Sequence, residues 1–289
     1  MSEATHIPAR PPMLHAISVD VEDWFQSTFD ADAALSDRFE ASTMKVLEAF
    51  ASRGIRGTFF VLGLAAEKAP GIIRKIAAAG HEVQSHGYGH RNNYDLTREQ
   101  LRQDLLRAKG LVEDLCGQEV YGYRAPCFTI DGRNLWALDV LVETRHRYDS
   151  SIFPLKTSRY GIDGYPPEAR IVTTPGGGRL VEAPVACCHV VGRRLPVGGG
   201  GYFRLWPYVA LRMAWRQMER VGRPGIVYFH PYEYDPGEMS AYRVEVPLVQ
   251  RLHQGIGRKS FPGKIDRLLH DFRFGPMGEV LGPLLKDLG

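Results

Sequence analysis

The feature that most constrains the fold of this chain is a repeated alternation of short strand-like runs with amphipathic helical segments. Residues 14–21 (LHAISVDV), 57–62 (GTFFVL) and 225–229 (GIVYF) are rich in apolar, β-branched and aromatic residues, which is typical of buried strands. The clearest helix covers residues 97–116, because it opens with a Thr-x-x-Gln capping pattern and ends before a glycine. Strands connected through helices run parallel, so we predict an α/β sheet or barrel.

Shorter elements continue this rhythm until residue 160. The other expected strands are residues 81–85, 120–124 and 147–150, and the other expected helices are residues 40–53, 72–79, 134–144 and 207–221. Between residues 160 and 208 we expect a Gly-rich insertion that includes an antiparallel segment at 179–185. Its glycine runs are followed by no Lys-Ser/Thr pair, which excludes a phosphate-binding loop. Residues 245–289 are predicted to be mostly helical.

The charge balance and the cysteines narrow the class of protein. The chain has 36 basic and 33 acidic residues, a formal net charge of +3, so we expect no nucleic-acid partner. It contains no stretch of about 18 apolar residues, so we expect no transmembrane segment. Residues 1–12 lack the apolar run of a secretory signal, and the four cysteines form no C-x-x-C pair. We therefore expect reduced thiols and a cytoplasmic location.

Two histidines point to a metal. His86 and His90 are four residues apart, a spacing that lets both face one metal on a helical turn. A carboxylate from the acidic cluster at residues 20–23 would complete a set that leaves one coordination position open, as in catalytic zinc sites. The spacing is a short pattern that exposed loop histidines can also produce. Placement adds a second argument, since the candidate polar residues all fall at or just past expected strand ends: Asp20, Glu22, Asp23, His86, Arg124 and Asp149.

The remaining polar residues supply what the hydrolysis of an amide requires. Asp20 could take a proton from water, and His230, oriented by Asp149, could protonate the departing nitrogen. Arg124 could anchor a carboxylate through a bidentate pair. Each residue also has a purely structural alternative: a turn cap for Asp20, a surface ion pair for Arg124 and a loop histidine for His230.

Aromatic residues of the insertion could face a sugar. In the functional interpretation, a substrate-facing loop offers stacking and hydrogen bonds through Tyr202, Phe203, Arg204 and Trp206. Tyr232, which follows the last strand, offers a further aromatic contact. The alternatives are an ordinary surface loop and aromatic residues of the core.

Taken in order, these motifs resemble the polysaccharide deacetylases of carbohydrate esterase family 4, whose catalytic domain is named for the NodB protein. The resembling segments are residues 18–23 (SVDVED), 85–90 (SHGYGH), 122–126 (GYRAP), 148–151 (YDSS) and 227–231 (VYFHP). Within that family, residues 20–24 (DVEDW) and 199–204 (GGGYFR) most resemble the exosortase-associated exopolysaccharide deacetylases.

The resemblance implies a fold and a domain layout. The fold is a distorted seven-stranded (β/α) barrel of the NodB type, with the Gly-rich insertion and a C-terminal helical extension. We expect a disordered tail over residues 1–13, the deacetylase catalytic domain over residues 14–240, and the extension over residues 241–289, packed on the same domain.

The resemblance also implies roles for individual residues. It implies that Asp20 is the base and that Arg124 positions it. It implies that the metal ligands are His86 and His90, that the acid is His230 and that Asp149 is the partner of this acid. It also implies that Cys127 donates an oxyanion-binding N–H, next to the substrate-binding Pro126. The implied metal is Zn²⁺, with Co²⁺ or Ni²⁺ as alternatives.

Two departures from the family pattern leave questions open. The usual first motif has two adjacent aspartates, the second being the metal ligand, but Val21 stands in that adjacent place. Residues two apart share a face of a strand, so Glu22 would point the same way as Asp20 and could be the ligand. If the strand turns at Val21, Asp23, with the shorter side chain typical of the family, could be the ligand instead, and the sequence leaves both open. The usual tryptophan of the fourth motif is also absent, since residues 149–152 read DSSI.

The expected activity is metal-dependent hydrolysis of N-acetyl groups from amino-sugar residues of a poly- or oligosaccharide, with release of acetate. The expected partners are this acetylated substrate and the machinery of exopolysaccharide biosynthesis. Two alternatives remain: hydrolysis of a cyclic ureide-like small molecule, which some relatives carry out without metal, and a non-catalytic sugar-binding module.

Overall fold

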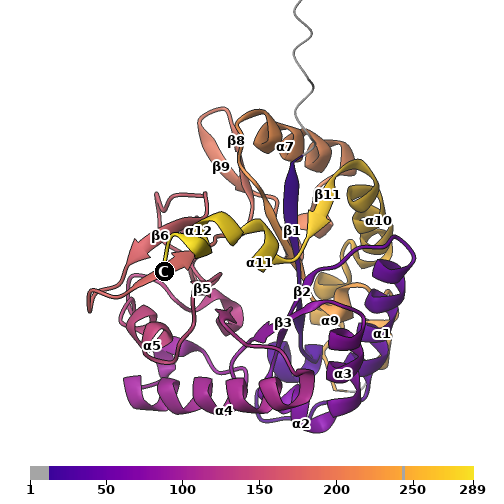
Figure 1. Ribbon diagram of the computed structural model, residues 1–289. Coiled ribbons are helices and arrows are strands. Elements are labelled where there is room, and N and C mark those ends of the chain that lie inside the picture. The colour runs from indigo at the N-terminus through magenta and orange to yellow at the C-terminus, as the bar shows by residue number, and fades with distance from the viewer. Residues whose placement is uncertain (1–12, 243–244) are drawn as a thin grey trace, which may run out of the picture.

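The computed structural model describes residues 13–242 and 245–289, and its centre is a nine-stranded sheet (Figure 1). Its strand order is β10-β1-β2-β3-β4-β5-β7-β6, and β11 also pairs with β1. The strands are β1 (Leu14–Val21), β2 (Thr58–Val61), β3 (Glu82–Ser85), β4 (Gly122–Tyr123), β5 (Tyr148–Asp149), β6 (Arg170–Thr173), β7 (Arg179–Glu182), β10 (Ile226–Phe229) and β11 (Arg273–Gly275). All neighbouring pairs are parallel except β6 with β7. The α/β prediction is therefore confirmed.

Seven strands, from β10 to β7, form a continuous parallel path, but within the described residues this path does not close into the expected barrel. The outer edge of β10 is occupied by loop backbone instead. Ala186 N–H donates to Ile226 O over 2.9 Å, and Tyr228 N–H donates to Gly198 O over 2.7 Å. A Cβ on Gly199 would lie 1.9 Å from Tyr228 O, so only glycine permits this approach.

Helices cover the outside of the sheet (Figure 1). They are α1 (Arg38–Ala51), α2 (Gly63–Lys68), α3 (Pro70–Ala78), α4 (Arg98–Cys116), α5 (Ala137–Glu143), α6 (Gly200–Leu205), α7 (Tyr208–Arg220), α8 (Glu238–Ala241), α9 (Leu248–Gly255), α10 (Phe261–Asp271), α11 (Met277–Val280) and α12 (Gly282–Lys286). The capping pattern of α4 is confirmed: the Thr97 hydroxyl accepts from Gln100 N–H, and Gln100 Oε1 accepts from Thr97 N–H. No helix in the described residues is long and apolar enough to cross a membrane.

Single helical turns connect several elements. These are η1 (Phe25–Phe29), η2 (Asn93–Asp95), η3 (Pro126–Phe128), η4 (Pro231–Glu233) and η5 (Arg258–Ser260). Three of them, η1, η3 and η4, follow closely on the ends of β1, β4 and β10, and so turn the chain at one edge of the sheet.

The sequence-based assignment differs from the structure in four places. Residues 179–185 were expected to be antiparallel only, but β7 also pairs in parallel with β5 and so belongs to the main sheet. A separate two-stranded hairpin, β8 (Cys187–Val190) with β9 (Arg193–Pro196), follows it. The glycine run at 198–201 begins helix α6 rather than a loop, and the three-residue β11 interrupts the helical C-terminal segment. The expected disordered tail, apart from Met13, lies outside the described residues.

The C-terminal helices share a hydrophobic core with the sheet. Phe261 of α10 is fully buried, and its ring contacts Phe203 of α6 and Phe229 of β10 with centroids 5.7 and 5.6 Å apart. Ile265 and Leu268 of the same helix belong to the same cluster. We propose, in line with the expected layout, that the residues after 240 fold with the sheet as one cooperative unit.

This proposal makes a prediction for Phe261→Ala. Loss of a buried ring in the shared core should lower the free energy of unfolding by about 3–5 kcal/mol, measured by urea denaturation followed by circular dichroism. The control is Val249→Ala on α9, whose side chain is 79% exposed, and which should change stability by less than about 0.5 kcal/mol. Equal stability of Phe261→Ala and wild type would contradict a shared core.

Candidate active site

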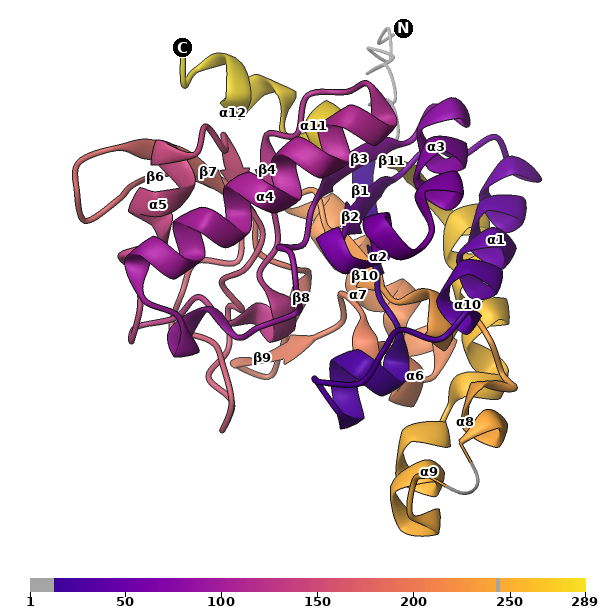
Figure 2. The ribbon, with the colours of Figure 1, turned by 90° about the horizontal axis from the view of Figure 1, so that it is seen from below.

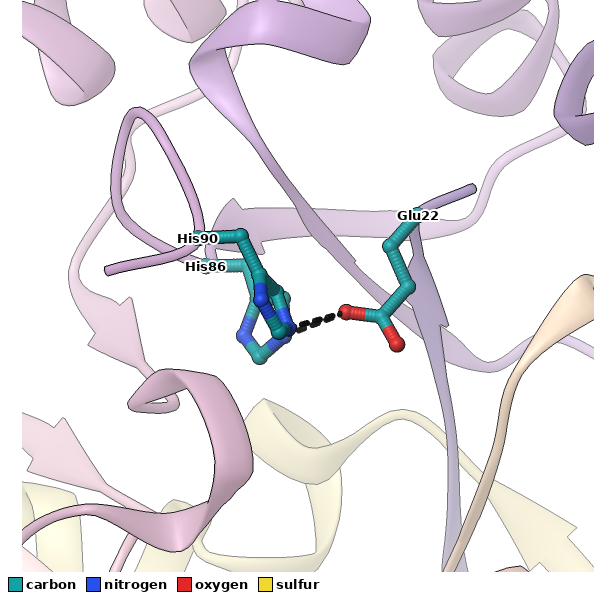
Figure 3. Close-up of side chains that lie close together, drawn as sticks. All are labelled: Glu22, His86 and His90. Carbon is teal, nitrogen blue, oxygen red and sulfur yellow. Dashed lines mark ion pairs between the residues drawn. The ribbon is translucent and has the colours of Figure 1, made fainter. Parts of the chain in front are cut away.

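Three candidate metal ligands meet where β1 and β3 end (Figure 3). Glu22 follows β1, and His86 follows β3, where its N–H donates to Val61 O. Glu22 Oε2 lies 2.7 Å from His90 Nε2 and 3.4 Å from His86 Nε2. The candidate ligand atoms of the three residues all lie within 4.8 Å of one another, and the side chains are buried. The structure thus brings together two imidazoles and one carboxylate around a single point.

The neighbouring Asp23 is used differently. Its Oδ1 accepts hydrogen bonds from Phe25 N–H (2.9 Å) and Gln26 N–H (3.1 Å), and its Oδ2 accepts from Ser36. Asp23 therefore caps the turn η1. Of the two acidic residues left open by the sequence, Glu22 is the one that reaches the histidines, since it continues the alternation of β1 on the same face as Asp20.

The donor set fits the expected metal. His86 donates from Nδ1 to Arg124 O over 2.7 Å, which leaves its Nε2 lone pair facing Glu22. Burial raises the pKa of Glu22, but the nearby His90 and His230 together lower this pKa well below its ordinary value. A carboxylate and two neutral imidazoles suit Zn²⁺, and Co²⁺ or Ni²⁺ accept the same ligands.

A fully buried ion pair lies beside this cluster. Arg124 donates from Nη1 to Asp20 Oδ1 over 2.7 Å and to Ser18 Oγ over 2.8 Å. Its Nη2 donates to Ser150 Oγ over 3.0 Å, and its guanidinium lies 4.3 Å from the centre of the Phe60 ring. Arg124 is therefore a buried residue and not a surface residue. Its guanidinium fixes the position of the Asp20 carboxylate through Oδ1.

His230 follows β10 and faces the cluster from the other side. Its Nε2 lies 3.3 Å from Glu22 Oε1, and its ring stacks on Tyr232 with centroids 4.7 Å apart. Its Nδ1 donates to Glu233 Oε2 over 2.9 Å. Burial lowers the pKa of His230, but Glu22 and Glu233 outweigh this and raise it to about 9.

The expected partner of His230, Asp149, lies elsewhere. Asp149 accepts from the Ser151 hydroxyl and shares a hydrogen bond with Glu182, its register partner on β7. Both carboxyls are fully buried, and burial raises the pKa of each, that of Asp149 to about 6 and that of Glu182 well above its ordinary value. The pairing of Asp149 with His230 is thus corrected: Asp149 belongs to a proton-sharing acid pair, and Glu233 contacts His230.

Arg204 also has a different place from the one expected. Its Nε lies 3.0 Å from Glu233 Oε1, and its Nη1 donates to Gln254 O. Burial raises the pKa of Glu233, but the hydrogen bond to His230 and the positive charge of Arg204 lower it overall. Arg204 therefore anchors the partner of His230 instead of lying in a substrate-facing loop. A glutamate three residues after His230, on a tight turn, is a signal that could have identified Glu233 from the sequence.

The other expected sugar-binding residues are scattered. Phe203 lies fully in the core, and Trp206 donates from Nε1 to Pro196 O. Tyr232 donates its hydroxyl to Glu22 Oε1 over 3.1 Å and so supports a metal ligand. Tyr202 is 36% exposed and stacks on Phe153. Pro126 is buried at the start of η3.

A cavity of about 160 Å³ joins the parts of the site. Its lining residues come from six separate segments of the chain: Asp20, Glu22, Ser27, Thr28, His86, His90, Ala125, Cys127, Phe128, Arg159, Tyr160, Tyr228, His230 and Tyr232. The sequence gives no spacing signal for residues that meet only in the fold, and seven lining residues were not among the expected site residues: Ser27, Thr28, Ala125, Phe128, Arg159, Tyr160 and Tyr228. Cys127, with a φ of 53°, lines the cavity as expected.

The fold and the site together define an α/β protein of the NodB type with a candidate metal centre at the ends of its parallel strands. Residues 22–140 match the family described as polysaccharide deacetylase, and residues 150–282 match a domain of unknown function, DUF3473. The first match contains all three candidate metal ligands and Arg124. Residues 22–140, less than half of the chain, thus resemble the polysaccharide deacetylase family.

Similar proteins carry related descriptions. A peptidoglycan-N-acetylglucosamine deacetylase of Bacillus cereus is 31% identical over 84 residues, which are 29% of this chain and 30% of that protein. A chitooligosaccharide deacetylase of Sinorhizobium fredii is 31% identical over 126 residues, 42% of this chain and 56% of that protein. The chain thus spans from about a third to just over half of these two relatives.

A solved structure extends the likeness of the fold to nearly the whole chain. The crystal structure of a Mycobacterium smegmatis protein described as a polysaccharide deacetylase covers 96% of this chain and 95% of its own, with a TM-score of 0.62 and 21% identity.

The geometry predicts which acidic residue binds metal. Glu22→Gln and His86→Ala should each weaken zinc binding by at least about a hundredfold, because each removes a ligand, whereas Asp23→Asn should retain about one zinc per chain. The measurement is elemental analysis of purified proteins after dialysis against zinc. Loss of zinc from Asp23→Asn with retention in Glu22→Gln would reverse the assignment.

Proposed function

We propose that this protein removes N-acetyl groups from amino-sugar residues of a poly- or oligosaccharide by metal-dependent hydrolysis, releasing acetate. The observation that carries the proposal is that Asp20, which is ion-paired with Arg124, and His230 border one cavity with Glu22, His86 and His90. The match of residues 22–140 to the polysaccharide deacetylase family supports it, as do the descriptions of the relatives as peptidoglycan and chitooligosaccharide deacetylases.

The metal and the base have separate tasks in this proposal. A Zn²⁺, Co²⁺ or Ni²⁺ ion held by Glu22, His86 and His90 would polarise the acetamide carbonyl and acidify a water molecule. Asp20, fixed through Oδ1 by Arg124, keeps its second oxygen for the proton of the attacking water.

The acid and the oxyanion donor lie on the other walls of the cavity. His230 gives its Nδ1–H to Glu233, so its Nε2 is left to deliver a proton to the departing sugar nitrogen. Burial lowers the pKa of His230, but the negative charges of Glu22 and Glu233 raise it to about 9, in the direction that a proton donor requires. The Cys127 backbone N–H is the proposed donor to the oxyanion, since Cys127 borders the same cavity.

We further propose that the substrate is an exopolysaccharide and that the machinery that assembles it is the partner of this protein. The support is the match of residues 150–282 to DUF3473, the domain found in exopolysaccharide deacetylases.

The base assignment predicts the effect of Asp20→Asn. Acetate release from N-acetylated chitooligosaccharides should fall roughly 100- to 10,000-fold, because the amide cannot accept the proton, while zinc content stays at the wild-type level. Circular dichroism should confirm that the fold survives. The matched control is Asp163→Asn on the exposed surface, which should leave the rate unchanged. Turnover of Asp20→Asn at the wild-type rate would refute the assignment.

The partner of His230 is tested by comparing two carboxyl groups. Glu233→Gln should lower kcat roughly 10- to 100-fold with little change in KM, because it loosens the orientation of the acid. Asp149→Asn should change kcat by less than about threefold, since its contacts are with Ser151 and Glu182. If Asp149→Asn has the larger effect on kcat and Glu233→Gln is silent, the original pairing of Asp149 with His230 is the better account.

A further inference from the structure

Helix α9 contributes no buried side chain, yet it carries large apolar residues. Leu248, Val249, Leu252 and the following Ile256 are 59%, 79%, 63% and 51% exposed. Leu248, Leu252 and Ile256 recur every fourth position, so they lie along one side of the helix. We name these four residues the α9 stripe. Clustered exposure of this kind marks a surface that contacts a partner or a membrane.

Helix α6 extends the stripe. Arg204 donates from Nη1 to Gln254 O at the end of α9, and Lys264 of α10 donates to Arg204 O over 2.6 Å. The first bond holds the C-terminal end of α6 against the end of α9, and the second ties the same end of α6 to α10. Leu205 of α6 is 64% exposed there. Figure 2 shows α8 and α9 projecting from one side of the molecule, opposite α11 and α12.

The segment that carries the stripe is basic. Residues 245–267 contain five Arg and Lys but two Asp and Glu, a net charge of +3. Lys259 and Arg267, which follow the stripe along the chain, are exposed. Of the two acidic residues, Asp266 is paired with Arg53, while Glu245 is exposed.

We propose that the α9 stripe and Leu205 dock on the surface of an anionic phospholipid bilayer. Exposed Leu, Val and Ile side chains enter the boundary between headgroups and acyl chains, while surrounding Arg and Lys attract lipid phosphates. A second copy of the chain is a poorer occupant, because pairing through the same surface would bring like charges together. The proposal does not depend on the proposed deacetylation.

The docking surface lies next to the candidate active site. Val246, just before α9, packs in one small cluster with Trp24 and Tyr232. Tyr232 borders the cavity and contacts Glu22. Docking through α9 would therefore keep the cavity close to the lipid surface.

The experiment is co-sedimentation of the full chain with vesicles. Wild type should sediment with phosphatidylcholine vesicles that contain about 30% phosphatidylglycerol, remain in the supernatant with pure phosphatidylcholine, and bind less at about 0.5 M salt. Leu252→Glu should weaken binding at least about tenfold. The matched control, Leu106→Glu on α4, where Leu106 is 40% exposed, should bind like wild type.

Further outcomes separate the proposal from its rivals. Wild type that stays in the supernatant with both vesicles, or Leu252→Glu that binds equally well, overturns it. A dimer seen by light scattering in wild type and lost in Leu252→Glu, without vesicle binding, assigns the surface to a second copy. Val249→Glu provides a second exposed variant should Leu252→Glu fail to fold by circular dichroism. Acetate release from soluble chitooligosaccharides should be equal in wild type and Leu252→Glu, so failure of the activity and failure of docking are distinguishable.

Discussion

The site depends on the Arg124 guanidinium, buried at the ends of the central strands. It ties β1 to β4 and β5 through Asp20, Ser18 and Ser150, and the carbonyl of the same residue fixes the ring of His86. The side chain of Arg124 therefore fixes the position of the proposed base, and the backbone of the same residue orients a candidate metal ligand. Since an unpaired charge at this depth is strongly unfavourable, each partner is constrained by the others, and the strand ends can adopt few other arrangements.

Much of this arrangement was accessible from the sequence, because it follows from local rules. The strand at residues 14–21 matches β1. The rule that reactive residues gather at the ends of parallel strands grouped Asp20, His86 and Arg124, and in the structure hydrogen bonds join Arg124 to the other two. The alternation of side chains along a strand allowed Glu22 and a turn at Val21 allowed Asp23, so the sequence left both residues open. Only the structure could decide between them, because the capping bonds of Asp23 depend on the conformation of the following turn.

The errors share a physical cause, since they concern partners chosen by tertiary packing. Asp149 pairs across the sheet with Glu182, and Arg204 reaches Glu233, both beyond the range of any spacing rule. Glycine misled the prediction at residues 198–201, where a loop was expected. There the absent side chains allow the backbone to approach β10 and then to begin α6.

The loop that covers β10 has a consequence for solubility. An open parallel sheet normally leaves unpaired N–H and C=O groups on its outer strands, which can template aggregation with another chain. Here the backbone of Ala186 and Gly198 occupies this edge at β10. At the opposite edge, β6 is four residues long and begins with the exposed Arg170. Both borders therefore disfavour cross-chain strand pairing, which lets an incompletely closed barrel persist at high protein concentration.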